Sequence, residues 1–213
     1  MKGMESMSES AGAAVVGLTG QSGAGKTTVC KVFDEKGFAV INADKIARVI
    51  MEKDSPCLAE VTECFGNCIL LEDGSLNRQK LADIIFGDHE KLMQLNAISY
   101  PYITSEILKM INKYRDENKR YVLIDAPTLF ESRADDFCDL IISVTASEDL
   151  RRERIAARDG LTEEQISERF SSQHTEEFFI NHSDFIIKNN NSVEELIEKA
   201  EEVAEKVKEY YNA

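Results

Sequence analysis

Proline, glycine and long apolar segments are all scarce in this sequence of 213 residues. Three prolines and 11 glycines are too few for a collagen-like or low-complexity chain. No apolar run approaches the roughly 18 residues that a membrane-spanning helix needs, so we do not expect an integral membrane protein. The five cysteines are odd in number and form no dense framework, which indicates reduced thiols and a cytoplasmic location rather than disulfides.

Basic residues are also in short supply. The chain has 25 Lys and Arg against 39 Asp and Glu, a formal net charge of −14. Such an acidic chain is a poor non-specific partner for nucleic acid or for an anionic membrane. A local pocket can still bind a small phosphorylated ligand. We therefore expect a small-molecule partner, no nucleic acid, no membrane, and a monomer or weak homo-oligomer.

Short apolar segments alternate with helical patterns along most of the chain. Residues 1–12 contain no apolar stretch, so we expect a disordered leader there and no secretory signal. The remainder, 13–213, is expected to form one domain. Alternating strands and helices predict an α/β fold with a mostly parallel sheet covered on both faces. The five predicted strands are 13–18, 39–41, 121–125, 140–145 and 185–187.

The long segment between the second and third predicted strands is mostly helical in pattern. It covers about 44–118 and is a candidate subdomain. Asn77 is expected to cap a helix, and Pro101 is expected at the first position of a longer one. Further along, Thr162 and Gln165 have the spacing of a capping box at the start of another helix.

A glycine-rich motif follows the first predicted strand and precedes a helix. Residues 20–27 read GQSGAGKT and match the pattern G-x-x-x-x-G-K-[ST], which is typical of a phosphate-binding loop. In such a loop Lys26 would reach the β- and γ-phosphates and Thr27 would hold Mg²⁺. The motif predicts ATP and Mg²⁺ as cofactors, against the alternative of an ordinary glycine-rich turn. The expected nucleotide contacts are Gly20, Ser22, Gly23, Ala24, Gly25, Lys26, Thr27 and Thr28.

Two carboxylates fall at the carboxyl ends of predicted strands, where open α/β sheets bind their ligands. Asp125 ends the third strand and is a candidate to support Mg²⁺ together with Thr27. Asp44 follows the second strand and could accept the proton of an attacking hydroxyl. The structural alternatives are a helix N-cap for Asp44 and a turn residue for Asp125.

Four arginines gather on one predicted helix of this acidic chain, at positions 151, 152, 154 and 158. Arg154 and Arg158 are four residues apart and share a face of the helix. Such a face can neutralise charge that develops on a transferring phosphoryl group, so both are catalytic candidates. The alternative is a solvated helix whose arginines pair with neighbouring acids.

Taken together, these motifs resemble the dephospho-coenzyme A kinase family over nearly the whole chain, from about Val15 to the last helix. The phosphate-loop stretch GLTGQSGAGKTTVCKVF is shared with many kinases, whereas the order and spacing of the others are more specific. These others are GFAVINADKIAR, LADIIF, LNAISYPYI, VLIDAPTLFES, LRRERIAARDGLTEEQISERFSSQ and SDFIIKNNNSVEEL.

The resemblance implies a three-layer P-loop kinase with a five-stranded parallel sheet. It also implies a helical acceptor-binding subdomain at about 44–118 and a small lid at about 147–183. Its reaction transfers the γ-phosphoryl of ATP to the 3′-hydroxyl of dephospho-CoA, the last step of coenzyme A biosynthesis. By this resemblance Asp44 is the base, Lys26 and Thr27 contact phosphate and Mg²⁺, Arg154 and Arg158 are lid arginines, and Asn190 lies in the segment that flanks the adenine of ATP.

The sequence departs from the family pattern at several positions. Asn42 replaces the first of two Asp residues, Tyr100 replaces a His, and Lys188 replaces an Asp near the adenine segment. Two alternatives therefore stay open: a small-molecule kinase with a nucleoside-type acceptor, and a nucleotide-binding regulator without transfer activity. A signalling GTPase is disfavoured, because no N-K-x-D segment is present.

Overall fold

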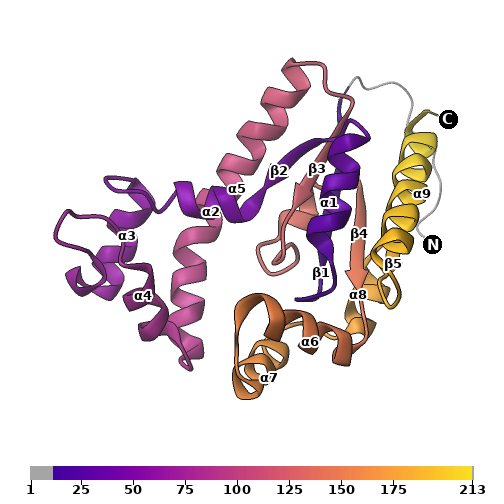
Figure 1. Ribbon diagram of the computed structural model, residues 1–213. Coiled ribbons are helices and arrows are strands. Elements are labelled where there is room, and N and C mark those ends of the chain that lie inside the picture. Colours follow the sequence, from indigo (N-terminus) through magenta and orange to yellow (C-terminus); the bar gives the residue numbers. More distant parts are fainter. Residues whose placement is uncertain (1–11, 213) are drawn as a thin grey trace.

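The computed structural model describes residues 12–212, and its centre is a five-stranded, fully parallel sheet (Figure 1). The strand order β2-β3-β1-β4-β5 places β1 in the middle and leaves β2 and β5 at the edges. The leader expected at 1–12 lies outside the described residues except for Gly12. The strands are β1 (Ala14–Gly20), β2 (Ala39–Asn42), β3 (Tyr121–Asp125), β4 (Leu140–Thr145) and β5 (Phe185–Lys188). The predicted parallel α/β fold is therefore confirmed.

Alternate residues of each strand point to opposite faces, so the sheet has a core on each side. On one face Val16 and Leu18 pack with α1 (Lys26–Glu35) and α9 (Val193–Asn212). On the other face Val15 packs with α5 (His89–Asp116) and the helices joined to it. All seven residues of β1 are buried, as expected for a central strand covered on both faces.

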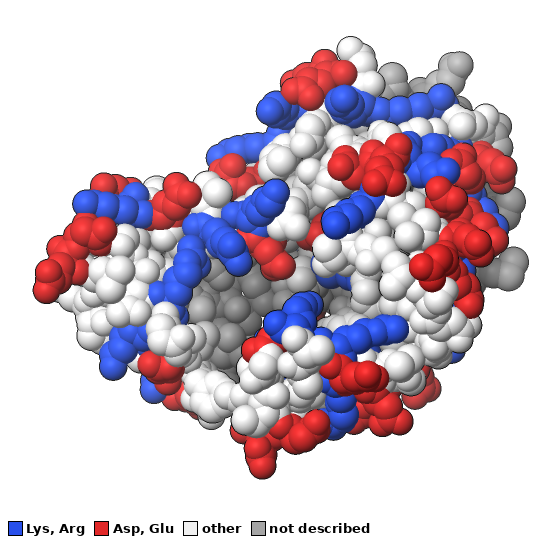
Figure 2. Space-filling model, viewed as in Figure 1, with Lys and Arg blue, Asp and Glu red and all other residues white. Residues whose placement is uncertain are grey.

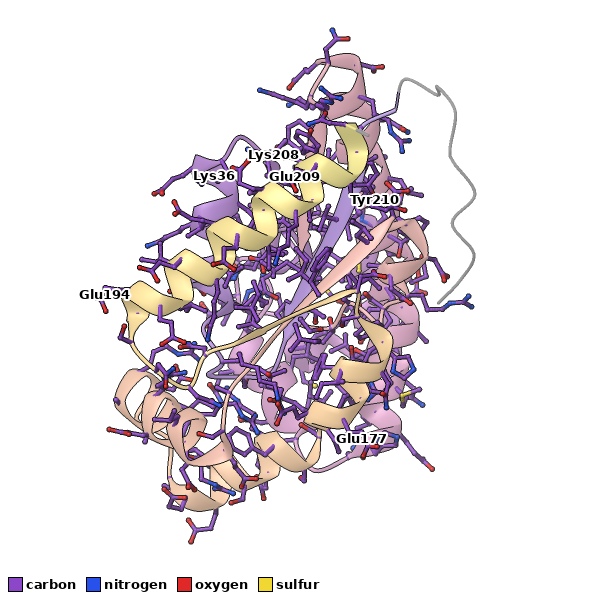
Figure 3. The ribbon with its side chains drawn as sticks, turned by 90° about the vertical axis from the view of Figure 1, so that its right-hand side faces the viewer. Lys36, Glu177, Glu194, Lys208, Glu209 and Tyr210 are labelled. Carbon is purple, nitrogen blue, oxygen red and sulfur yellow. The ribbon has the colours of Figure 1, made fainter. Side chains whose placement is uncertain are left out.

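The last helix, α9, lies along one face of the sheet beside α1 (Figure 3). One side of this helix is apolar and buried, with Leu196, Ala200, Val203, Ala204 and Val207. Lys36, labelled in Figure 3, pairs with Glu201 at 3.3 Å and Glu205 at 3.8 Å on the outer side of this helix. Burial of its apolar stripe against the core, rather than these exposed ion pairs, accounts for most of its attachment.

A group of helices between β2 and β3 projects to one side of the sheet (Figure 1). Its members are α2 (Ala43–Val49), α3 (Pro56–Phe65), the 3₁₀ turn η1 (Asn67–Ile69), α4 (Arg78–Ile85) and α5. The side chain of Asn77 accepts a hydrogen bond from the Lys80 N–H at 3.0 Å, which confirms the predicted cap of α4.

The prediction for Pro101 was wrong, because this residue lies inside α5 and not at its first turn. The helix begins after Asp88, whose side chain accepts a hydrogen bond from the Lys91 N–H at 3.1 Å. An internal proline removes one backbone hydrogen bond. Leu95 before it and Ile107 after it pack into the same cluster, and this shared burial keeps the helix continuous across the proline.

Three further helices lie between β4 and β5, near the carboxyl ends of the strands (Figure 1). They are α6 (Glu148–Asp159), α7 (Glu163–Ser171) and α8 (Glu176–His182), and a 3₁₀ turn, η2 (Ala134–Phe137), precedes β4. Thr162 and Gln165 form the predicted capping box at the start of α7. None of the helices within residues 12–212 is both long and apolar enough to cross a membrane.

Substitution of Phe33 tests the core under α1. The side chain of Phe33 is fully buried and contacts Phe38 edge to face, with 4.8 Å between the ring centroids. We expect Phe33→Ala to lower the free energy of unfolding by about 3–5 kcal/mol, measured by denaturant unfolding. The exposed Phe86 offers a matched control, and Phe86→Ala is expected to change it by less than about 0.5 kcal/mol. Equal losses for the two variants would contradict this description of the core.

Candidate functional site

The phosphate-binding motif forms the loop between the end of β1 and the start of α1, as its sequence context predicts. Gly25, the N-cap residue of α1, has a φ of 103°, a backbone conformation that residues other than glycine rarely adopt. No side chain caps this helix, and its first turn contains no acidic residue. Its N-terminal field and its backbone N–H groups are therefore suited to phosphate.

The loop is held from behind by residues that come later in the chain. The Ala24 carbonyl accepts a hydrogen bond at 2.8 Å from the side chain of Asn189, which is buried at the end of β5. The Arg154 guanidinium donates to the Gly23 carbonyl at 3.4 Å and to the Asn189 carbonyl at 3.3 Å. The role of Asn189 was not predicted from the sequence, although the run of polar residues after the fifth strand could have indicated it.

Lys26 and Asp125 meet at the carboxyl end of the sheet. The Lys26 ammonium donates to Oδ1 of Asp125, and only 8% of the Asp125 side chain is exposed. The other carboxylate oxygen, Oδ2, accepts a hydrogen bond from the Asn42 amide at 2.8 Å. Asp125 is thus a buried carboxylate with a partner on each oxygen, and not only a turn residue.

Oxygen ligands for Mg²⁺ are available beside this pair. Thr27 follows Lys26 and is exposed, so its hydroxyl and the Asp125 carboxylate offer the hard oxygen donors that this ion prefers. Within residues 12–212 no group of three or more His, Cys, Asp or Glu could hold a metal ion by itself. This donor set fits an ion that shares its ligands with bound phosphates and water.

Cys30, one helical turn after Lys26, is a partly buried thiol beside the carboxylate. Burial raises the pKa of this thiol to about 11, and the nearby Asp125 charge adds to the effect. The thiol is therefore protonated at neutral pH, and nucleophilic chemistry at this position is not expected.

Asp44 is exposed in the first turn of α2, two residues beyond the end of β2. The alternative that Asp44 caps this helix is wrong. Asn42 is the N-cap, and its side-chain oxygen accepts a hydrogen bond from the Lys45 N–H at 2.8 Å. Asp44 therefore makes no capping bond, and its carboxylate is open to solvent at the edge of the site.

The structure separates the two arginines that the sequence paired. Arg154 lies against the phosphate loop, as described above. Arg158, two positions before Gly160 at the end of α6, is 61% exposed and donates to both oxygens of Asp159, at 2.7 and 2.9 Å. Arg169 of α7 also pairs with Asp159 at 2.7 Å, and these two arginines hold the pKa of its carboxyl well below the usual range.

The other two arginines of α6 differ from each other as well. Arg152 pairs with Glu148 at 2.7 Å on its own helix and with Glu163 of α7 at 3.3 Å, so it joins α6 to α7. Arg151 is buried between α6 and α7, and its guanidinium lies 4.1 Å from the centre of the Phe170 ring. Burial lowers the pKa of Arg151.

The segment between α7 and α8 and the helix α6 also contact the phosphate loop directly. The side-chain oxygen of Gln173 accepts a hydrogen bond from the Ser22 N–H at 3.2 Å, a contact that the sequence did not reveal. The backbone of Arg151 packs so closely on Gly23 that any side chain at position 23 would collide with it. Among the remaining predicted contacts, Gly20 ends β1 and Thr28 lies in the first turn of α1.

Asn190 is exposed, and its side chain accepts a hydrogen bond from the Ser147 N–H at 2.8 Å. This bond ties the loop after β5 to the start of α6, next to Arg154. Lys188, just before this loop, pairs with Glu176 of α8 at 3.3 Å. The predicted adenine-flanking segment thus lies beside the phosphate loop.

The face that carries the site is hollowed between the helices α2 to α5, the sheet and the helices α6 to α8 (Figure 2). Lys and Arg side chains gather around the hollow, although the chain as a whole is acidic. Glu131, in the loop after β3, lies 3.6 Å from His174, which lies between α7 and α8. Burial and the Glu131 charge raise the pKa of Tyr100 on α5, so Tyr100 belongs to the same neighbourhood.

Curated relatives align with this chain over most of its length and most of their own. A dephospho-CoA kinase from Fusobacterium nucleatum is 39% identical over 91% of this chain and 98% of its own length. A dephospho-CoA kinase from Carboxydothermus hydrogenoformans is 36% identical over 91% of this chain and 94% of its own.

Solved structures give the same result. A protein from Thermus thermophilus superposes with a TM-score of 0.77 at 26% identity, over 92% of this chain and 98% of its own. A dephospho-CoA kinase from Campylobacter jejuni superposes with a TM-score of 0.61 at 26% identity, over 91% and 96% of the two chains. The family model for dephospho-CoA kinase matches residues 14–195, and with these relatives it shows that the chain belongs to the dephospho-CoA kinase family.

Proposed function

We propose that the protein transfers the γ-phosphoryl group of ATP to the 3′-hydroxyl of dephospho-CoA, giving CoA and ADP. The observation that carries this proposal is the cluster of Lys26, Asp125 and Asn42 at the phosphate loop, with Asp44 two residues from Asn42. The identity of the acceptor, dephospho-CoA, is inferred from the family to which the chain belongs.

In the reaction the 3′-oxygen forms a bond to the γ-phosphorus. The bond from that phosphorus to the bridging oxygen breaks, and ADP leaves with the electron pair. Asp44 accepts the hydroxyl proton, since it is the exposed carboxylate next to the cluster. Lys26 moves from Asp125 to the phosphates when ATP binds.

The role of Mg²⁺ is to neutralise charge on the β- and γ-phosphates, with Thr27 and Asp125 as the ligands on this chain. Arg154 orients the nucleotide at the loop that contains Asn190. Arg158 neutralises charge on the transferring group once it leaves Asp159. The five cysteines, all free, support a cytoplasmic location. A monomer or weak homo-oligomer stays a prediction.

Asp44→Asn tests the base. We expect kcat to fall by roughly 10²–10⁴-fold with the KM for ATP nearly unchanged, because proton transfer is lost while the phosphate loop is intact. The measurement is a coupled ADP-release assay with MgATP and dephospho-CoA, with uridine and cytidine as alternative acceptors. Glu52→Gln, an exposed acid just after α2, is the matched control. An unchanged kcat for Asp44→Asn would remove this residue as the base.

Arg154→Ala and Arg158→Ala should differ in which constant they change. We expect Arg154→Ala mainly to raise the KM for ATP, because the guanidinium holds the Gly23 and Asn189 carbonyls. Arg158→Ala should mainly lower kcat, by about 10–10³-fold, because its charge is needed in the transition state. Arg152→Ala, on the same helix but paired with Glu148, serves as the control. If both variants behaved like this control, neither arginine would have its proposed role.

A further inference from the structure

A cavity of about 260 Å³ lies between the phosphate loop, α6, α7 and the segment that leads into α8. Gln21 of the loop, Arg151 of α6 and Phe170 of α7 line it, and Gln173 closes one side. The first turn of α1, which carries Lys26, does not belong to the lining, so the cavity is separate from the expected site of the nucleotide phosphates. Its volume is well above the ~10–15 Å³ that a single water needs.

Arg151 brings an unpaired charge to this cavity. Only 6% of the residue is exposed, and its Nε has no hydrogen-bond partner among residues 12–212. The guanidinium lies 4.1 Å from the centre of the Phe170 ring, which orients it without neutralising its charge. Because a buried cation without a counter-charge is costly, the cavity favours a ligand that brings a negative charge.

The carboxylates nearest to Arg151 are already paired with other cations. Glu148 pairs with Arg152 at 2.7 Å, and Glu176 pairs with Lys188 at 3.3 Å. Of the three Arg and Glu side chains that line the cavity, only Arg151 therefore lacks an ion-pair partner within the described part of the chain. The lining thus has a positive charge that is not balanced, although the protein as a whole is acidic.

Gln21 contributes a second buried atom without a partner. Only 6% of this residue is exposed, and its Oε1 accepts no hydrogen bond from residues 12–212. The cavity therefore presents one unused donor, the Nε–H of Arg151, and one unused acceptor, the Oε1 of Gln21. An anion that also carries a hydroxyl matches both atoms. Inorganic phosphate keeps a P–OH group at neutral pH, whereas sulfate has acceptor oxygens only.

We propose that this cavity binds inorganic phosphate, with Arg151 donating to an anionic oxygen and Gln21 accepting from the P–OH group. Because its walls come from the phosphate loop, α6 and α7, a bound ion holds these three segments together. A phosphate group of a nucleotide offers similar chemistry, so the test has to distinguish the free ion from the nucleotide. The proposal does not depend on the acceptor of the phosphoryl transfer.

The test is a titration of the full chain with sodium phosphate and, separately, with sodium sulfate, followed by calorimetry and by the melting temperature. In one arm a non-hydrolysable ATP analogue with Mg²⁺ fills the nucleotide site. In a second arm, without nucleotide, Lys26→Ala removes the cation of the phosphate loop. We expect saturable phosphate binding in the millimolar range in both arms, and weaker binding of sulfate.

Arg151→Gln should weaken phosphate binding by about 10–100-fold, the loss expected when a hydrogen bond to a charged group is removed. Arg120→Gln is the matched control, because the Arg120 guanidinium also lies over an aromatic ring, that of Tyr121, at 5.8 Å. Arg120 is exposed and lies at the opposite end of the strands, so its variant should keep the wild-type affinity. Gln21→Met should lower the affinity for phosphate to that for sulfate.

Loss of phosphate binding in the presence of the ATP analogue, or in Lys26→Ala, would overturn the proposal, because the ion would then occupy the nucleotide's own phosphate site. The same holds if phosphate does not bind saturably, or if Arg151→Gln binds it as tightly as Arg120→Gln does. Equal affinities of the wild-type chain for phosphate and sulfate would overturn the role of Gln21. The melting temperature without added anion shows whether each variant folds, and Gln21→Met decides the matter if Arg151→Gln does not.

Discussion

The contact between Lys26 and Asp125 is the interaction around which the site is built. It joins the first turn of α1 to the end of β3, and thus the phosphate loop to the strand beside the central one. Both side chains are largely buried, so each charge needs the other while no phosphate is bound. Asn42 extends this contact to the edge strand and to α2.

The parallel sheet makes this convergence possible. Because all the strands run in the same direction, the ends of β1, β2 and β3 meet at one edge, and their last residues come together without any local sequence proximity. The helices between β2 and β3 then project beside this edge, while α6 to α8 close it from the other side (Figure 1). The same topology that buries both faces of the sheet creates the hollow in Figure 2.

Much of the fold could be predicted because its signals are local. The strands end at clear apolar boundaries, the phosphate loop has the complete motif, and Asn77 and Thr162 cap their helices where the sequence places them. Pro101 was misplaced because the packing of α5 outweighs the cost of an internal proline, and packing of that kind is not visible in the sequence.

The site was less predictable, because its details depend on contacts between distant segments. The position of Asp125 beside the phosphate loop could be predicted from the rule on strand ends, whereas its pairing with Lys26 was not. The different surroundings of Arg154 and Arg158 could not be predicted, because the two residues share one face of the helix and only their partners distinguish them. The hydrogen bonds of the buried Asn189 and of Asn42 were not predicted for the same reason, because Asn189 bonds to Ala24 and Asn42 bonds to Asp125, far away in the sequence.

The attachment of α6 to the phosphate loop has a mechanical consequence. Its first half is fixed to the loop by the close packing of Arg151 on Gly23 and by the bonds of Arg154, whereas its far end carries the exposed Arg158. Because α6 runs without interruption from Arg151 to Arg158, a shift of the phosphate loop that moved Arg151 and Arg154 would also move Arg158. It would reach α7 as well, because Asp159 at the end of α6 pairs with Arg169.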